Sequence, residues 1–152
     1  MRILVINGPN LNLLGIREPD IYGKEDYNSL LRQIADHAGE IGVDAQFFQS
    51  NHEGAIVDAI QNAYFDAVDG IVINPAAYTH TSVAIADALK AVALPAVEVH
   101  ISQVEKREAF RQTSYVRDCV LATVSGQGFA GYLQAIDILK AHLEEKAHES
   151  GI

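Results

Sequence analysis

The sequence predicts an α/β protein, a three-layer, doubly wound domain whose five parallel strands follow the flavodoxin-like order 2-1-3-4-5. Three observations support this fold. Short runs rich in β-branched residues alternate with helical patterns along the chain. Four of the five runs are almost entirely apolar, as expected of parallel strands covered on both faces. The second run alternates polar and apolar residues, which is typical of an edge strand, and right-handed crossovers then give this order.

The expected strands lie at 2–6 (RILVI), 43–48 (VDAQFF), 70–74 (GIVIN), 95–100 (PAVEVH) and 120–124 (VLATV). Apolar residues recur at helical spacing in the stretches from Leu30 to Ile41, from Ile56 to Tyr64 and from Leu133 to Leu143. We expect one catalytic domain over residues 1–152, with a frayed tail over 144–152.

The stretch SVAIADALKAVA (82–93) predicts a helix that is apolar around most of its circumference, with only Asp87 and Lys90 charged. A helix that covers one side of a sheet normally shows a polar stripe toward solvent. We therefore expect a second buried face on this helix, supplied by another copy of the chain in a homo-oligomer.

The composition limits the possible classes of function. The chain has 152 residues, of which 49% are hydrophobic, and a formal net charge of −9. A nucleic-acid-binding surface needs clustered lysine and arginine, so we expect no nucleic-acid partner. No apolar run is long enough to span a bilayer, and no stretch resembles a secretory signal. The single cysteine, Cys119, cannot form an internal disulfide, and we expect a cytoplasmic protein.

Polar residues collect where three adjacent strands of the predicted sheet end. In doubly wound sheets, ligands bind outside the carboxyl ends of the strands, at the point where the strand order reverses. Turn or helix-capping roles are alternatives for Asn7, Asn74 and Ser82, and a structural role is the alternative for His80. The residues at these ends are Asn7, Asn10, Asn74, His80, Thr81, Ser82, Glu98, His100 and Ser102.

Glu98 and His100 suggest acid catalysis. Alternate residues of a strand share a face, so the carboxylate can lie beside the imidazole and orient it. This pair indicates a general acid, with a purely structural ion pair as the alternative. A metal site built from His80, Glu98 and His100 is a further alternative. No metal-ligand spacing such as H-E-x-x-H accompanies them, and we expect neither a metal nor a cofactor.

The connection NGPNLNLLGIREPDIYG (7–23) is much longer than the roughly 2–6 residues usual between a strand and a helix. Its turns and apolar residues predict a lid that closes over the site and excludes water. Arg17 on this lid, with Arg107 and Arg111 of VEKREAFRQ (104–112), would form a positive site for an anionic or polyhydroxylated substrate. If that segment is helical, its two arginines share one face.

Nearby arginines would also make Tyr22 a useful base. Tyrosine acts as a base only as the phenolate, and its pKa of about 10 falls by about 1–3 units when opposite charges lie close by. The alternative is a structural tyrosine beside surface arginines. On the first interpretation, Tyr22 abstracts a carbon-bound proton and His100 protonates a leaving group, which describes a lyase.

Two other classes of function remain open on these residues. A receiver or flavin-binding module would share the fold, but its acidic cluster or hydroxyl-rich phosphate loop is replaced by Asn-Gly-Pro-Asn. A different metal-independent lyase, acting on an anionic polyol or a phosphorylated sugar, would use the same cations. Gly126, Gly128 and Gly131 match a dinucleotide-binding pattern, but neither a further strand nor an acidic ribose ligand follows them, and the SGQG segment adds little.

Four motifs carry a resemblance to the type II 3-dehydroquinate dehydratases: INGPNLNLLGIREPDIYG, QSNHEG, INPAAYTHTS, and EVHIS followed by REAFR. They occur in the family's order and cover nearly the whole chain. The resemblance implies the anti elimination of water from 3-dehydroquinate to 3-dehydroshikimate through an enolate, in the shikimate and quinate pathways and without a Schiff base. It also implies a dodecamer made of four trimers.

The resemblance further implies a role for each site residue. Tyr22 would be the base, Arg17 the cation that activates it, and Asn10 the residue that positions a water at the enolate oxygen. His100, oriented by Glu98, would protonate the departing hydroxyl. The remaining contacts would come from Asn74, His80, Arg111, the amides of Ile101 and Ser102, Arg107 as a second cation near the tyrosine, and Asp87 of a neighbouring subunit. The chain departs from the family pattern at Gln103, Glu105 and Gln127, none of them a proposed catalytic group.

Overall fold

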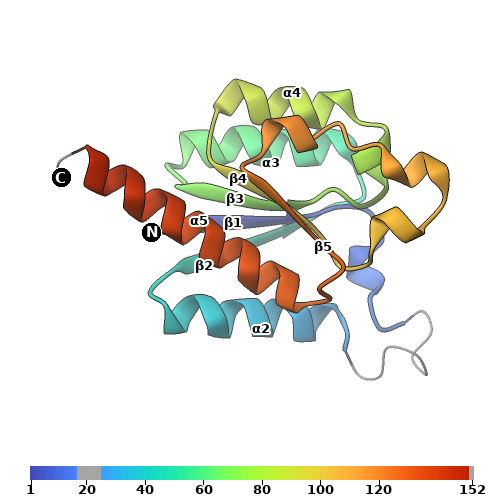
Figure 1. Ribbon diagram of the computed structural model, residues 1–152, viewed down its shortest axis with the longest axis horizontal. Helices are drawn as coiled ribbons and strands as arrows, with labels where there is room; N and C mark the ends of the chain where they lie inside the picture. Colours follow the sequence, from blue (N-terminus) through green and yellow to red (C-terminus); the bar gives the residue numbers. More distant parts are fainter. Residues whose placement is uncertain (17–24, 151–152) are drawn as a thin grey trace.

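The computed structural model describes residues 1–16 and 25–150, which form a five-stranded parallel sheet with helices on both faces (Figure 1). The strand order β2-β1-β3-β4-β5 confirms the predicted fold class and places the second strand at an edge. The third strand has the predicted bounds, and the other four differ from the predicted ranges by one or two residues at an end. The strands are β1 (Arg2–Asn7), β2 (Asp44–Gln49), β3 (Gly70–Asn74), β4 (Ala96–His100) and β5 (Ala122–Ser125).

Two helices cover each face of the sheet, which gives the three layers seen in Figure 1. Aliphatic side chains such as Ile34 and Ile136 pack on one face, and Ile60 and Ile85 pack on the other, all fully buried. Burial of these side chains is the main force that holds the layers together. None of the described helices has the length and apolarity needed to cross a membrane. The first face carries α2 (Tyr27–Glu40) and α5 (Ala130–Glu149), and the second carries α3 (Glu53–Phe65) and α4 (Val83–Val92).

The last helix extends further than the sequence predicted. α5 continues to Glu149, so the stretch from 144 that was expected to fray is helical as far as that residue. Lys140 Nζ lies 3.5 Å from Glu144 Oε1, and the two residues form an ion pair across one helical turn. Lys146 and His148 lie in the last turn, where basic side chains interact favourably with the helix dipole.

The basic segment 104–112 is not one helix. It forms two short 3₁₀ turns, Val104–Lys106 and Ala109–Gln112, and the backbone is extended at Arg107 between them. The Val104 carbonyl accepts the Arg107 N–H at 3.0 Å, which is 3₁₀ spacing, and the Gln112 side-chain amide at 2.8 Å. The condition under which Arg107 and Arg111 would share one helical face is therefore not met.

The carboxyl ends of β1 and β3 approach each other closely at Gly8. The Gly8 N–H donates to the Asn74 carbonyl at 2.8 Å. A Cβ atom at Gly8 would lie 2.4 Å from the Pro75 carbonyl oxygen and 2.6 Å from its carbon, so no larger residue fits without moving the backbone. Glycine is required here by space, because it lets the two strand ends carry Asn7 and Asn74 side by side.

A second close approach lies just before α2. Gly15 has a φ of +87°, and a Cβ atom there would lie 2.7 Å from the Asp26 Cβ atom. Asp26 in turn caps α2, because its Oδ1 atom accepts the Ser29 N–H at 2.8 Å. Gly15 and Asp26 therefore lie in close contact, one before and one after residues 17–24 in the sequence.

We predict that Gly8→Ala lowers the free energy of unfolding by about 1–3 kcal/mol, the usual cost of overpacking a closely packed site. The measurement is urea unfolding followed by circular dichroism. Gly39→Ala is the matched control, because a Cβ atom at Gly39, inside α2, would contact nothing within 4 Å. The control should leave stability unchanged or raise it by up to about 1 kcal/mol. Equal effects from the two substitutions would contradict the steric argument.

Candidate active site

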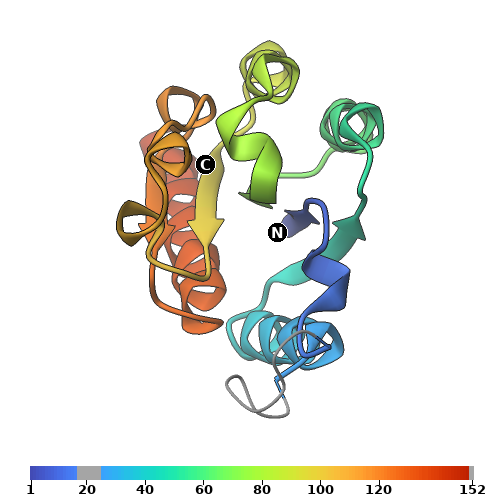
Figure 2. The ribbon, with the colours of Figure 1, turned by 90° about the vertical axis from the view of Figure 1, so that its right-hand side faces the viewer.

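The residues predicted to carry chemistry lie together at the carboxyl edge of the sheet. Figure 2 looks onto this edge, where the segments that follow β1, β3 and β4 surround the strand ends. Asn7 pairs with Asn74 in the ladder between β1 and β3, and His100 pairs with Ser125 between β4 and β5. The strands thus bring into one place residues that are far apart in the sequence.

Glu98 is the most buried charged group at this edge, with no exposed surface. Its Oε2 atom accepts from His100 Nε2 at 2.5 Å and from the Ser114 hydroxyl at 2.8 Å. Its Oε1 atom accepts from the Thr123 hydroxyl at 2.9 Å and lies 3.8 Å from Arg117 Nε. Burial alone would raise the pKa of Glu98. The hydrogen bonds from His100, Ser114 and Thr123, together with the positive charge of His100, hold that pKa below its usual value.

The pairing of Glu98 with His100 confirms the geometry expected from alternate strand positions. Because an ionised carboxylate only accepts hydrogen bonds, His100 donates through Nε2. The ring is nearly buried, with 6% of His100 exposed. Nδ1 is therefore the nitrogen of His100 that remains for a substrate.

His80 lies on the 3₁₀ turn Ala76–His80 that follows β3. Its Nδ1 atom lies 2.7 Å from the Thr113 carbonyl oxygen, and because a carbonyl only accepts, Nδ1 carries the proton. Nε2 of a neutral His80 is then a hydrogen-bond acceptor. The ring meets the Phe110 ring edge to face, with centroids 6.3 Å apart. These contacts fix both the tautomer and the plane of the ring.

Asn7 and Asn74 are buried, and their side chains share one partner that the sequence did not reveal, Tyr132 of α5. The Tyr132 hydroxyl donates to Asn7 Oδ1 at 2.6 Å and accepts from Asn74 Nδ2 at 3.0 Å. Asn74 Oδ1 also accepts the Ala76 N–H at 3.1 Å, so its expected turn role is present as well. In the structure Tyr132 lies with Ala135, Ile136 and Leu139 on the buried side of α5, just before the helical stretch that the sequence predicted.

Asn10 is exposed and has a positive φ of 69°, the left-handed conformation that asparagine tolerates better than most residues. Its N–H donates to Asn51 Oδ1 at 3.1 Å. Gln49 donates to the Gly8 carbonyl at 3.1 Å, and the Tyr78 hydroxyl donates to the Asn51 carbonyl at 2.8 Å. The QSNHEG motif therefore ties the segments after β1 and β3 together, a supporting role that the sequence alone did not show.

Arg111 and Arg107 follow β4, Arg111 on the second 3₁₀ turn and Arg107 on the extended backbone between the two turns. Arg111 donates from Nε to Glu108 Oε2 at 2.5 Å and lies over the Phe110 ring, 4.9 Å from its centroid. The backbone of Glu108 itself and the Arg111 guanidinium keep the pKa of the Glu108 carboxyl below its usual value. Arg107 is exposed. Because Arg111 is bonded through Nε, its two terminal amino groups are the donors that remain for an anion.

The segment after β5, which was expected to add little, supports the residues that follow β4. The Gly128 N–H donates to the Ile101 carbonyl at 3.1 Å, and the Ser125 hydroxyl donates to the Ser102 carbonyl at 3.2 Å. Gly126 has a φ of +77°, and a Cβ atom there would lie 2.3 Å from Gln103 Cγ. Gly126 and Gly131 therefore serve close packing, whereas a Cβ atom at Gly128 would meet nothing within 4 Å and this glycine has a φ of +61°. The support that this segment gives to the residues after β4 was not predicted from the sequence.

Among the described residues, one predicted site residue lies apart from this cluster: Asp87 is on the exposed side of α4. The predictions for Arg17 and Tyr22 fall outside the described residues. Ser82 has the expected capping role, because its hydroxyl accepts the Ile85 N–H at 3.0 Å. Within residues 1–16 and 25–150, no group of three or more His, Cys, Asp or Glu side chains could hold a metal ion.

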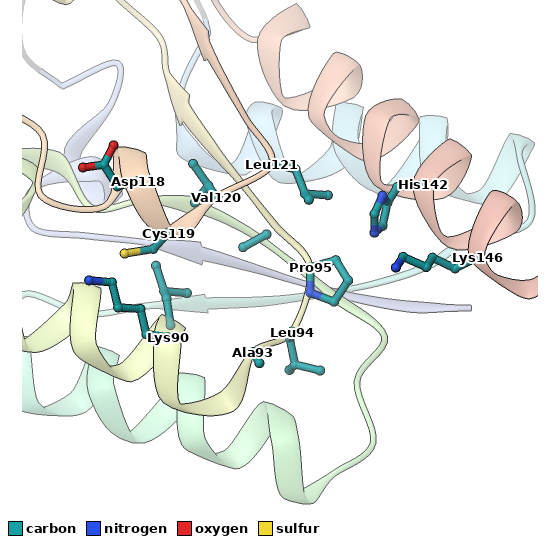
Figure 3. A pocket seen from close by; sticks show the side chains of 12 residues that line it. Lys90, Ala93, Leu94, Pro95, Asp118, Cys119, Val120, Leu121, His142 and Lys146 are labelled. Carbon is teal, nitrogen blue, oxygen red and sulfur yellow. The ribbon is translucent and has the colours of Figure 1, made fainter.

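A hollow of about 530 Å³ lies elsewhere in the molecule, near the start of β4 (Figure 3). Lys90 comes from one side, His142 and Lys146 come from α5 on the other, and Pro95 lies between them. None of the residues that line it belongs to the strand-end cluster. The candidate active site is therefore defined by its buried polar groups and not by this hollow.

Fold and site together define the class of protein. It is a doubly wound α/β enzyme, and its candidate site at the carboxyl edge of the sheet pairs a buried carboxylate with a histidine, with amides and arginines on the neighbouring segments. Residues 1–140 match the family described as dehydroquinase class II, and the chain belongs to that family.

Relatives of nearly equal length support this assignment. The chain is 52% identical over 146 residues to a 3-dehydroquinate dehydratase of Clostridium perfringens (strain 13 / Type A), covering 96% of this chain and 100% of the relative. It is 55% identical over 138 residues to that of Lachnospira eligens, covering 90% and 94%. The crystal structure of a type II dehydroquinase from Butyrivibrio crossotus matches with a TM-score of 0.88 and 53% identity, covering 92% of this chain and 97% of that one.

We predict that Glu98 makes stability depend on acidity. Its pKa is lower in the folded chain than in the unfolded chain, so its contribution is complete above the unfolded value of about 4.3 and is lost as the pH falls through the folded value. The free energy of unfolding should fall most steeply with acidification in the wild type, less in Thr123→Val, and least in Glu98→Gln. Denaturant unfolding at a series of pH values measures the three slopes. Identical slopes would show that Glu98 is not the group responsible.

Proposed function

We propose that this chain is a 3-dehydroquinate dehydratase, a hydro-lyase that converts 3-dehydroquinate to 3-dehydroshikimate. Family membership over residues 1–140 supports the reaction, and relatives with this activity in their names match over almost their whole length. The structural observation that carries the proposal is the buried Glu98 carboxylate hydrogen-bonded to His100 at the carboxyl edge of the sheet. This pair supplies the positioned acid that the loss of a hydroxyl group requires.

His100 acts as the acid in this proposal. Glu98 orients the ring through Nε2 and balances the positive charge of a protonated imidazole, which leaves Nδ1–H to face the substrate hydroxyl. As the carbon–oxygen bond breaks, the proton moves from Nδ1 to the departing oxygen, and water leaves. The low exposure of His100 keeps bulk solvent from competing for that proton.

Tyr22 acts as the base and Arg17 as the cation that makes its phenolate accessible. The phenolate removes a proton from the carbon next to the substrate carbonyl, and the electron pair moves into an enolate. Asn10 positions a water at the enolate oxygen. When the enolate collapses, the new carbon–carbon double bond forms and the hydroxyl departs on the opposite face, which is an anti elimination. No lysine adduct and no metal takes part in this sequence of steps.

The remaining residues bind the substrate. The Asn74 amide, Nε2 of His80 and the terminal amino groups of Arg111 are placed to contact hydroxyl and carboxylate groups. The backbone N–H groups of Ile101 and Ser102 receive the carboxylate, because the Gly128 and Ser125 contacts hold that turn in place. Arg107 is a second cation beside Tyr22.

We also propose that the chain assembles as a homo-oligomer, a dodecamer of four trimers, in the cytoplasm. The exposed side of α4 carries Val83, Ala84 and Ala91 beside Asp87, an unusually apolar surface for a solvent-facing helix. A neighbouring copy that covers this surface would take Asp87 into its own site.

The first test is the ultraviolet absorbance of the purified protein with 3-dehydroquinate in the presence of a chelator. Growth of the conjugated enone band would support a metal-independent dehydratase. Tyr22→Phe should then lower kcat by several orders of magnitude, because phenylalanine cannot accept the proton. Tyr64→Phe, on the exposed surface of α3, is the matched control and should turn over normally. Near-normal turnover by Tyr22→Phe, or a covalent adduct after borohydride treatment with substrate, would exclude the tyrosine mechanism.

The oligomer is tested by size-exclusion chromatography with light scattering. We expect a mass of twelve times the 16.5 kDa of one chain, and a stable monomer at low micromolar concentration would contradict the proposal. Asp87→Ala should keep that mass and lower kcat/KM, because the missing carboxylate would belong to the neighbour's site. An unchanged kcat/KM in the intact oligomer would remove Asp87 from the site.

A further inference from the structure

We propose that Tyr132 is a positioning residue for the reaction: its buried hydroxyl fixes the orientation of the Asn74 side-chain amide and of Asn7 beside it. The inference rests on the proposed function, in which Asn74 contacts the substrate. Tyr132 itself does not touch the substrate, since it has no exposed surface and lies beneath the strand ends in the first turn of α5.

The hydrogen-bond directions around this hydroxyl permit one arrangement. The single hydroxyl proton of Tyr132 goes to Asn7 Oδ1 at 2.6 Å, so the phenol oxygen can only accept from Asn74 at 3.0 Å. Asn74 must therefore present its amino group to Tyr132. Its carbonyl oxygen then meets the Ala76 N–H at 3.1 Å, and a flipped amide would lose both contacts. One amino hydrogen of Asn74 is left for a ligand.

The same network continues to the start of α2. Asn7 Nδ2 donates to the Tyr27 hydroxyl at 3.3 Å, and Tyr27 is the first residue of that helix. Burial raises the pKa of Tyr27 and that of Tyr132, which keeps both hydroxyls protonated and unable to serve as bases. Tyr27 of α2 and Tyr132 of α5 thus hold the side-chain amides of Asn7 and Asn74 by hydrogen bonds.

Packing alone does not require the Tyr132 hydroxyl. The ring lies in the apolar cluster with Leu139, Ile136 and Ala135 of its own helix, where a phenylalanine ring would fill the same space. Placing a hydroxyl in such surroundings carries a desolvation cost that only its hydrogen bonds offset. Those bonds go to two amides at the carboxyl edge of the sheet, where the reaction takes place.

Three variants test the inference in a double-mutant cycle: Tyr132→Phe, Asn74→Ala and the combination of both. Steady-state kcat and KM for 3-dehydroquinate are measured well below the melting temperature of each variant. We expect Tyr132→Phe to lower kcat/KM about 3- to 30-fold, the factor that corresponds to one or two lost hydrogen bonds. In the Asn74→Ala background the same change should alter kcat/KM less than about twofold, because the amide it orients is gone.

Ile136→Val is the matched control for stability. It truncates a fully buried residue of the same helix, so it should lower the melting temperature and leave kcat/KM unchanged. Asn7→Ala is the alternative probe should Tyr132→Phe not fold, because it removes the acceptor that orients the hydroxyl. It should also lower kcat/KM, and again only when Asn74 is present.

A Tyr132→Phe variant that loses stability and keeps its kcat/KM, as the Ile136→Val control does, would overturn the proposal. An equal loss in the Asn74→Ala background would overturn it as well, since Tyr132 would then act through another group. Failure of the proposed function is a separate outcome: the wild type itself would show no turnover.

Discussion

A buried carboxylate is the constraint on which the rest of this site depends. Removing an ionised Glu98 from water would cost several kcal/mol without partners, so the fold must bring donors to it. They come from three places: His100 on the same strand, Thr123 on β5, and Ser114 on the irregular segment between β4 and β5. The hydrogen bond from Ser114 to the Glu98 carboxylate therefore also fixes the path of the segment that carries Arg107 and Arg111.

A second cluster of buried polar groups, this one uncharged, lies at the ends of β1 and β3, and its members also have hydrogen-bond partners. The Asn7, Asn74 and Tyr132 side chains satisfy one another, and among the described buried side chains only Thr79 Oγ1 lacks a hydrogen-bond partner. Fully satisfied buried polar groups have one arrangement, and departing from it leaves donors or acceptors unpaired. The His100 ring and the Asn74 amide are thus held by hydrogen bonds without any ligand, which is the condition for electrostatic preorganisation.

A feature of the fold or of the candidate site could be predicted from the sequence where the residues that determine it are close together in the chain. Apolar runs predicted the five strands, and alternate positions on one strand placed Glu98 beside His100, because both patterns need only neighbouring residues. Tyr132 lies 125 residues from Asn7, and nothing in either segment marks the other as its partner. Whether the segment around Arg107 is one helix was left open by the sequence; there the Val104 carbonyl accepts the Arg107 N–H three residues on and the Gln112 side-chain amide, so the chain turns in 3₁₀ fashion.

The contact between Gly15 and Asp26 has a consequence for how this enzyme can vary. Because Gly15 and Asp26 are already in contact, the packing of the rest of the fold offsets the entropy cost of bringing the two ends of this connection together. Lengthening a closed loop is then inexpensive, about 0.6 kcal/mol for each doubling of its length. A change of length between the two residues would therefore cost the sheet and the buried polar clusters little, and its effect would fall on the residues between them, Arg17 and Tyr22 among them.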